Sequence, residues 1–205
     1  MSTNFKTHWE NVYQSKNENQ VSWYQKVPVK SLDMINSLNL NFESKIIDVG
    51  AGESRLVDNL LRLGFKNITV LDISSKSIEK TKNRLGKYSN LVNWIVSDIV
   101  DFKPLENYDL WHDRAAFHFL TEKSKINKYV DLVNSSINSK GNLIMSTFSK
   151  NGPLKCSGLQ ITQYDKISMK ELFKENFKLL HSEVSTHDTP FNTKQEFIFN
   201  IFSKH

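Results

Sequence analysis

A short strand-like segment that runs through a glycine turn into a helix-like segment is the feature that most constrains this fold. Residues 45–49 include β-branched side chains, and Gly50 and Gly52 permit a tight turn. Residues 55–63 then carry apolar side chains at helical spacing, and Gly64 is a suitable C-terminal cap. The sequence therefore predicts a strand, a glycine turn and a helix in immediate succession.

A second apolar run, residues 67–71, follows this helix and ends at Asp72. A strand at this place returns alongside the first strand, so Asp72 is expected beside the glycine turn. A carboxylate in that position can accept hydrogen bonds from both hydroxyls of a ribose. These residues together predict a site for a nucleoside-containing cofactor.

The glycine spacing narrows the choice of cofactor. A nicotinamide or flavin dinucleotide site requires the pattern G-x-G-x-x-G, in which the third glycine lets the helix approach the strand. Arg55 occupies the third position here, and a long charged side chain argues against a dinucleotide. The phosphate-binding pattern G-x-x-x-x-G-K-[ST] is also missing from the sequence.

The remaining pattern resembles the first motif of the class I methyltransferases, which bind S-adenosylmethionine. That motif is an acid followed by G-x-G and usually one more glycine, and the chain has Asp48, Gly50 and Gly52 with Ser54 in the last place. Ser54 departs from the usual glycine but can cap the following helix. The resemblance covers roughly residues 41–205. It implies an α/β Rossmann-like sheet of seven mostly parallel strands in the order 3-2-1-4-5-7-6, with strand 7 antiparallel and helices on both faces.

Later segments fit the same family. Residues 94–97 form an apolar run that ends at Asp98 and Ile99, where such enzymes hold the adenine ring. Residues 108–114 match the fourth strand, residues 141–148 the fifth, and residues 177–186 with 195–203 a closing hairpin. The resemblance assigns the following residues to the cofactor: Asp48, Gly50, Gly52, Asp72, Ile73, Asp98, Ile99 and Trp23.

The first forty residues hold four large aromatic side chains, Trp9, Tyr13, Trp23 and Tyr24, on either side of a polar stretch. The motifs H-W-E-x-V-Y and V-S-W-Y-Q around them resemble a group of small bacterial methyltransferases of the type-11/12 kind. In such enzymes this segment folds over cofactor and acceptor, so the resemblance implies a helical lid that excludes water. Plain packing of the aromatics onto the sheet is the alternative. Trp9, Tyr13 and Tyr24 are expected at the acceptor.

The loop at residues 111–120 brings imidazole, carboxylate and guanidinium groups next to apolar side chains. His112 or His118 is a candidate general base, although each histidine has a purely structural alternative. Asp113 and Arg114 are candidate catalytic residues, or else an ion pair that fixes the loop. The loop resembles the W-D-R-x-A stretch of thiopurine methyltransferases, with one histidine inserted. Phe117 and Phe148 are expected to line the acceptor pocket.

Composition predicts one compact methyltransferase domain over residues 1–205, because 205 residues with 39% hydrophobic content can bury one core. No apolar run is long enough to span a membrane and the N-terminus has no apolar signal core, so a cytoplasmic protein is expected. The single cysteine, Cys156, excludes an internal disulfide and a multi-cysteine metal site, and no metal is expected. The net charge is +5, but the lysines are dispersed, which disfavours nucleic acid as a partner. A monomer or homodimer is expected.

The methyl acceptor is predicted to be a small molecule. The sequence lacks the Asn/Asp-Pro-Pro-Tyr pattern of base and amide methylation, and it lacks the carboxylate cluster of a magnesium-dependent catechol enzyme. A small thiol or sulfide is favoured, since a thiol with a pKa of about 8.5 needs little help from a base. The alternatives are a protein lysine methyltransferase with a channel of Glu10, Trp111 and Asp113, and a catalytically silent cofactor-binding subunit.

Overall fold

The structure is a computed structural model that describes the backbone of residues 2–205 and the side chains of residues 5–205. Its large sheet has seven strands in the order β3-β2-β1-β4-β5-β9-β8, and β6 and β7 form a separate two-stranded ribbon. Without that ribbon, the order is the one the sequence predicts, so the α/β Rossmann-like fold is confirmed. The chain divides into two compact units, Met1–Lys103 and Pro104–His205.

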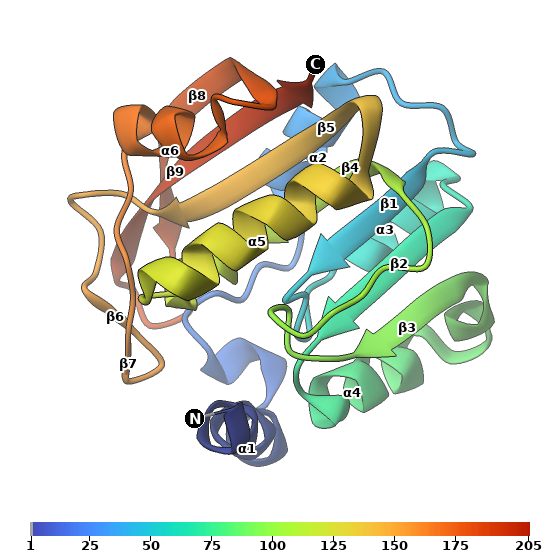
Figure 1. The fold of residues 1–205 in the computed structure, drawn as a ribbon. Coiled ribbons are helices and arrows are strands. Elements are labelled where there is room, and N and C mark those ends of the chain that lie inside the picture. The colour runs from blue at the N-terminus through green and yellow to red at the C-terminus, as the bar shows by residue number, and fades with distance from the viewer. Residues whose placement is uncertain (1) are drawn as a thin grey trace. The chain divides into compact units, whose positions relative to one another are not determined.

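The first unit contains three parallel strands and most of the helices of the chain (Figure 1). Its elements in chain order are α1 (Ser2–Ser15), η1 (Glu18–Gln20), α2 (Val29–Ser37), β1 (Lys45–Val49), α3 (Leu56–Leu63), β2 (Asn67–Asp72), α4 (Ser75–Leu85), η2 (Gly86–Leu91) and β3 (Val92–Val96).

Burial explains why these segments fold as they do. Ile46 and Ile47 of β1 are both fully buried, as expected for a strand of a parallel sheet that is covered on both faces. Helix α3 buries Leu56 and Leu60 on its apolar face. The helix ends at Gly64, whose φ of 96° is left-handed and whose N–H donates to the carbonyl of Leu60. The predicted strand, turn and helix are therefore all present.

The second unit contains the rest of the sheet. Its elements are β4 (Tyr108–Arg114), η3 (Phe117–Phe119), α5 (Lys123–Ser136), β5 (Ile137–Phe148), β6 (Lys155–Cys156), β7 (Leu159–Gln160), α6 (Lys166–Phe173), β8 (Phe177–Asp188) and β9 (Lys194–Lys204). Strand β4 runs parallel to β5, whereas β9 is antiparallel to both β5 and β8. The predicted closing hairpin is thus β8–β9.

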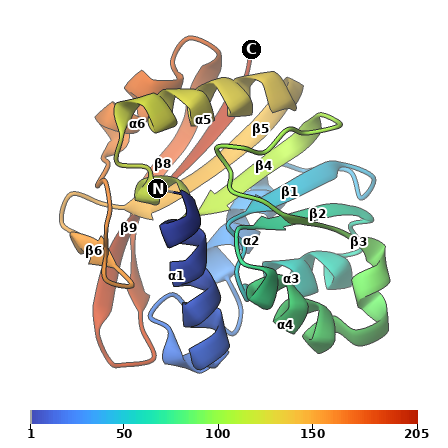
Figure 2. The same ribbon diagram turned by 60° about the horizontal axis from the view of Figure 1, so that its bottom comes forward.

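Helix α5 lies across one face of β4 and β5 (Figures 1 and 2). On that face, the indole N–H of Trp111 donates to the hydroxyl of Tyr129 from α5 at 3.0 Å. Side chains alternate along a strand, so Arg114 and Ser146, which are register partners, both belong to the opposite face. Phe148 is two residues beyond Ser146 and lies on the same face as Ser146. We call this face, opposite to the one that α5 covers, the far face of β5.

No helix among residues 2–205 has the length and apolar character needed to cross a membrane. In the same part of the chain, no three His, Cys, Asp or Glu side chains are arranged so that they could hold a metal ion.

Candidate active site

The loop between β1 and α3 has a backbone that suits glycine. Gly50 and Gly52 have φ values of 62° and 56°, in the left-handed region that other residues rarely adopt. The N–H of Gly52 donates to Oδ2 of Asp72 at 2.8 Å, and the N–H of Ala51 donates to the carbonyl of Leu71 at 3.2 Å. The glycine loop is therefore held directly against the end of β2.

Asp72 is a buried carboxylate at that point. Its Oδ1 accepts a hydrogen bond from the N–H of Ser74 at 2.8 Å. Burial raises the pKa of Asp72 to about 6, and the negative charge of Asp48 adds to this rise, while the backbone hydrogen bonds from Ser74 and Gly52 oppose it. A carboxylate has about four acceptor positions, so Asp72 can still accept hydrogen bonds from a ligand. Ile73, its neighbour, leads into α4.

The end of β3 lies next to the end of β2, because the N–H of Ser97 donates to the carbonyl of Asp72 at 3.0 Å. Asp98 follows, and its Oδ1 accepts from the N–H of Val100 at 3.1 Å. Asp98 and Ile99 are both half-buried, so solvent reaches part of each side chain. The first unit thus gathers the predicted ribose and adenine residues at one edge of the sheet.

Three of the N-terminal aromatic side chains form one cluster over this edge. The ring of Trp9 lies 6.0 Å from that of Tyr13 and 5.8 Å from that of Trp23. The hydroxyl of Tyr13 lies directly above Gly52, where a Cβ atom on Gly52 would collide with it. Tyr24 is half-buried nearby in the chain. The aromatics of α1 therefore pack against the glycine loop, and their role as a lid remains a prediction.

Glu10 attaches α1 to the start of α4. Its carboxylate accepts from the hydroxyl of Ser74 at 2.7 Å, from the N–H and hydroxyl of Ser75 at 2.8 and 2.9 Å, and from the N–H of Lys76 at 3.0 Å. Burial alone would raise the pKa of Glu10, but these hydrogen bonds lower it to about 2. The free N–H groups of a helix N-terminus attract a carboxylate, so this contact stabilises the docked α1.

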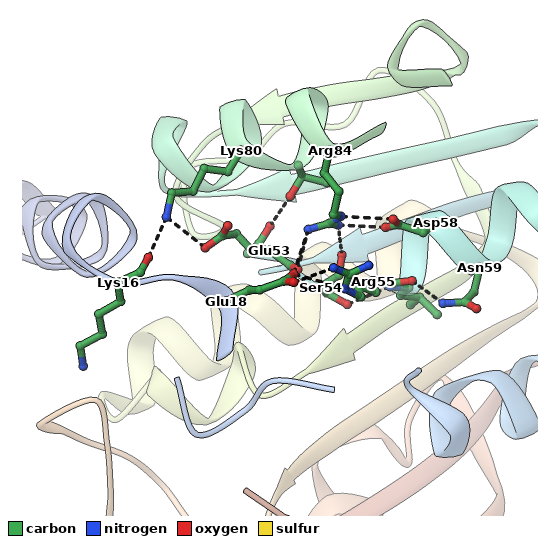
Figure 3. A network of polar contacts seen from close by, with 12 residues as sticks. Lys16, Glu18, Glu53, Ser54, Arg55, Asp58, Asn59, Lys80 and Arg84 are labelled. Atoms are coloured by element: carbon green, nitrogen blue, oxygen red, sulfur yellow. Dashed lines mark hydrogen bonds and ion pairs between the residues drawn. The ribbon is translucent and has the colours of Figure 1, made fainter. Parts of the chain in front are cut away.

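Two arginines connect the glycine loop to its surroundings (Figure 3). Arg55, which fills the place of the third glycine, directs its guanidinium to Glu18 of η1 with an N···O distance of 2.6 Å. Arg84 of α4 binds Asp58 at 2.9 Å and donates to the carbonyl of Ser54 at 2.8 Å. The long side chain of Arg55 fits at this position because it extends towards the N-terminal segment. The hydroxyl of Ser54 accepts from the N–H of Leu56 at 3.1 Å, but the N-cap position of α3 is Arg55, which makes no side-chain cap bond.

In the second unit, Asp113 is the centre of a buried hydrogen-bond network. Its Oδ1 accepts from the N–H groups of Ala116 and Phe117 at 2.9 and 3.1 Å, and its Oδ2 accepts from the hydroxyl of Tyr129 at 2.6 Å. Burial raises the pKa of Asp113 to about 6 against these hydrogen bonds. Ala115 within this turn has a φ of 69°, which is strained for alanine. Asp113 therefore holds the turn in shape.

His118 and Arg114 lie close to the end of β5. The N–H of Phe148 donates to Nδ1 of His118 at 3.3 Å, and the rings of these two residues are 4.8 Å apart. Burial, together with the positive charge of Arg114, lowers the pKa of His118 to about 3. The guanidinium carbon of Arg114 lies 5.5 Å from the ring centre of Phe197. His112 is buried within β4.

The structure thus brings the predicted residues together in two groups, one in each unit, and their individual roles remain predictions. Phe117 and Phe148 are both buried in the second unit, where Phe117 packs on Tyr129 with rings 4.7 Å apart. Sequence reasoning missed Tyr129 as the partner of Asp113 and Glu10 as the partner of α4. The serine pair at the start of α4 is a typical helix N-terminus, but nothing local identifies which acid binds there.

Comparisons with known proteins agree with this geometry. Residues 40–200 match the family described as "Methyltransferase domain". The chain is 32% identical over 106 residues to malonyl-[acyl-carrier protein] O-methyltransferase 2 of Ilyobacter polytropus. The aligned region covers 51% of this chain and 39% of that protein. This chain is also 27% identical over 82 residues to nodulation protein S of Rhizobium fredii, and here the aligned region covers 40% of this chain and 46% of that protein. The chain therefore spans less than half the length of these curated relatives.

Solved structures show the same fold. A S-adenosylmethionine-dependent methyltransferase from Anabaena variabilis has a TM-score of 0.76 at 12% identity, covering 100% of this chain and 95% of that chain. The N-methyltransferase NodS from Bradyrhizobium japonicum, solved with S-adenosylhomocysteine, has a TM-score of 0.71 at 13% identity, covering 96% of this chain and 98% of that chain.

The residues of the first unit fit this cofactor. Gly50 and Gly52 of the loop have left-handed φ values and no side chains of their own, Asp72 retains acceptor positions for ribose hydroxyls, and Asp98 is half-buried at the predicted adenine position. The match over residues 40–200, together with the sheet order, shows that the chain belongs to the class I S-adenosylmethionine-dependent methyltransferases, in the family described as "Methyltransferase domain".

Proposed function

We propose that the protein transfers a methyl group from S-adenosylmethionine to a small-molecule nucleophile, and that a small thiol or sulfide is the acceptor. The observation that carries this proposal is the state of two candidate bases, Asp113 near the end of β4 and His118 in η3. Burial lowers the pKa of His118 to about 3, so its imidazole is neutral at pH 7 and is a weak base toward a protonated acceptor. Both oxygens of Asp113 are engaged in hydrogen bonds. An acceptor that ionises by itself suits these groups better than an alcohol or an ammonium group.

Bound S-adenosylmethionine would supply an electrophilic methyl group, and the chain's own residues would bind and orient it. Asp72 would accept hydrogen bonds from the ribose, Asp98 and Ile99 would hold the adenine, and the glycine loop would allow the cofactor to approach the backbone. Trp9 and Tyr13 exclude water above the loop, which strengthens electrostatic contacts inside the site. Asp113 acts as a positioning residue, because its contacts fix the turn that carries Phe117 and His118.

O-methylation of a carboxyl group is a second candidate. The name of the Ilyobacter relative describes an O-methyltransferase that acts on a malonyl group. A carboxylate, like a thiolate, is already ionised at neutral pH and needs no general base. This shared property makes both acceptors compatible with a histidine whose pKa is about 3.

Protein lysine methylation is less well supported by the contacts. A lysine acceptor must lose a proton before it reacts, and the residues of the proposed channel are otherwise engaged. Glu10 binds the start of α4, while Trp111 and Asp113 both bind Tyr129. A silent cofactor-binding subunit is the remaining alternative. A cytoplasmic location, one domain over residues 1–205, and a monomer or homodimer also remain predictions.

The test is transfer of a labelled methyl group from S-adenosylmethionine to a panel of sulfide, small thiols, small carboxylates, phenols and lysate protein. The proposal expects labelled small thiols, and loss of labelling in the variant Asp72→Asn. Asp131→Asn, an exposed aspartate of α5, is the matched control and should retain activity. Label on carboxylates alone would select the second candidate, and label on protein alone would select lysine methylation. Cofactor binding without any product would indicate the silent subunit.

A further inference from the structure

We infer that the acceptor carries a carboxylate group, and that His118, Ser146 and Arg114 bind it at the far face of β5. This inference rests on the proposed function, since it describes the acceptor of the proposed methyl transfer. It concerns recognition, so it applies whether the methylated atom is a sulfur or an oxygen.

His118 presents a hydrogen-bond donor at this place. The N–H of Phe148 donates to Nδ1, so Nδ1 carries no proton. The imidazole is neutral, and its single proton is therefore on Nε2. Nε2 is buried and has no hydrogen-bond partner among residues 5–205. A buried N–H without an acceptor is costly, which indicates that a ligand completes this site.

Ser146 presents a second donor from β5. Its hydroxyl is fully buried and also lacks a hydrogen-bond partner within the described side chains. Ser146 is two residues before Phe148, whose ring packs on His118, so Ser146 shares the far face with this pair. Thr147 also has a buried hydroxyl without a hydrogen-bond partner within the described side chains. The alternation of the strand directs this hydroxyl to the face of β5 that α5 covers, away from Ser146.

Arg114 supplies positive charge to the same face. It is the register partner of Ser146 in the parallel pair β4–β5. Its charge lowers the pKa of His118 and also partly offsets the rise that burial causes in the pKa of Cys156. Arg114 is therefore within electrostatic range of both side chains from two different segments, and it places a guanidinium charge near the far face.

The cation Arg114, together with the two neutral donors His118 and Ser146, suits a carboxylate ligand. Its two oxygens can accept from the imidazole and the hydroxyl while its charge faces the guanidinium, and charge-assisted hydrogen bonds are strong away from water. A thiolate offers one weakly accepting sulfur atom and leaves a donor unsatisfied. The recognised group is thus a carboxylate, placed apart from the reacting atom in a thiol acceptor.

The first experiment compares two thiols, 3-mercaptopropionate and ethanethiol, which differ in the carboxylate. Ser146→Ala is expected to raise KM for 3-mercaptopropionate about tenfold, because it removes one hydrogen bond to a charged group. It should leave KM for ethanethiol and both kcat values within about twofold. Thr147→Val, which removes the neighbouring hydroxyl on the face that α5 covers, should change neither KM. Equal effects of Ser146→Ala on both thiols, or an equal effect of Thr147→Val, would overturn the inference.

A second measurement separates this inference from the proposed function. Propionate is titrated into the protein with S-adenosylhomocysteine present, and the ¹⁵N resonance of His118 Nε2, assigned with the variant His118→Gln, is followed. The inference expects a saturable shift that Ser146→Ala weakens and Thr147→Val preserves. Such a shift without methylation of any acceptor would refute the proposed function alone. Methylation of thiols with an unmoved Nε2 resonance would refute the carboxylate site alone.

Discussion

Asp72 and Asp113 show how contacts decide the role of a residue. Burial raises the pKa of each carboxyl to about 6. Asp72 is held by two backbone N–H groups, from Gly52 and Ser74, and retains acceptor positions for a ligand. Asp113 also accepts a hydrogen bond from the hydroxyl of Tyr129, and its contacts hold the turn after β4 in shape. The sequence predicted both aspartates as site residues, but only their partners distinguish a binding role from a positioning role.

The affinity for S-adenosylmethionine is expected to fall below pH 6 because of Asp72. Ribose hydroxyls donate to the ionised carboxylate, so a proton on Asp72, whose pKa is about 6, competes with the cofactor. Affinity should be highest above pH 6 and decrease by up to about tenfold for each pH unit below it. Calorimetric titration between pH 5 and pH 8 measures this dependence.

In the same titration, Asp72→Asn should bind weakly at every pH and lose the dependence, whereas the exposed control Asp131→Asn should keep it. An Asp72→Asn protein with the wild-type pH profile would contradict this role of the carboxylate.

Tyr129→Phe is expected to destabilise the protein more at high pH than at low pH. The pKa of Asp113 is raised to about 6 from its usual value of 3.8, so Asp113 destabilises the fold as pH rises through this interval and is a buried anion above it. Loss of the Tyr129 hydroxyl removes one donor from that anion. The free energy of unfolding should fall by about 2 kcal/mol at pH 8 and by less at pH 5.

Urea denaturation at the two pH values checks this expectation, with Tyr88→Phe as the control because Tyr88 is exposed. An equal loss for Tyr129→Phe at pH 5 and pH 8 would show that the hydroxyl does not stabilise an ionised Asp113.

At the scale of elements, local patterns predicted more than distant contacts did. The unit of β1, α3 and β2 was predicted correctly because its glycine turn, helix cap and apolar periods are all local. The docking of α1 on α4 was not predicted, since Glu10 and Ser74 are separated by 64 residues. The ribbon of β6 and β7 was not predicted for a different reason: its two strands span only Lys155–Cys156 and Leu159–Gln160, too short for a periodic signal.

Glu10→Gln is expected to loosen α1. The glutamine loses the charge that faces the N-terminus of α4 and keeps only one accepting oxygen, which should cost about 1 kcal/mol of stability. The pKa of Glu10 is lowered to about 2, so its contribution is fully present above pH 4.5 and lost as pH falls through 2. The measurement is chemical denaturation at pH 7 with hydrogen exchange of the α1 amides.

Glu79→Gln is the matched control, because Glu79 lies on α4, the helix that Glu10 contacts, and forms an exposed pair with Lys76. Faster exchange of α1 in Glu10→Gln alone is the expected result. Unchanged exchange in both variants would mean that Glu10 does not hold the helix.

At the scale of the whole molecule, the two units divide the chemistry along the chain. The predicted cofactor residues belong to Met1–Lys103, and His118, Ser146 and Arg114 belong to Pro104–His205. The fold and the cofactor were predictable because each strand that ends at a cofactor residue has its own apolar run. The acceptor was not, because the donors of the far face come from η3, β4 and β5, and the buried hydroxyl of Ser146 has no sequence signal.

Calorimetric titration of the purified protein with S-adenosylmethionine at pH 7.5 tests whether this protein uses that cofactor. We expect saturable binding with one molecule per chain, and much weaker binding by Asp72→Asn than by Asp131→Asn. No heat of binding in the folded wild-type protein, or equal binding by both variants, would refute a cofactor site for S-adenosylmethionine at Asp72.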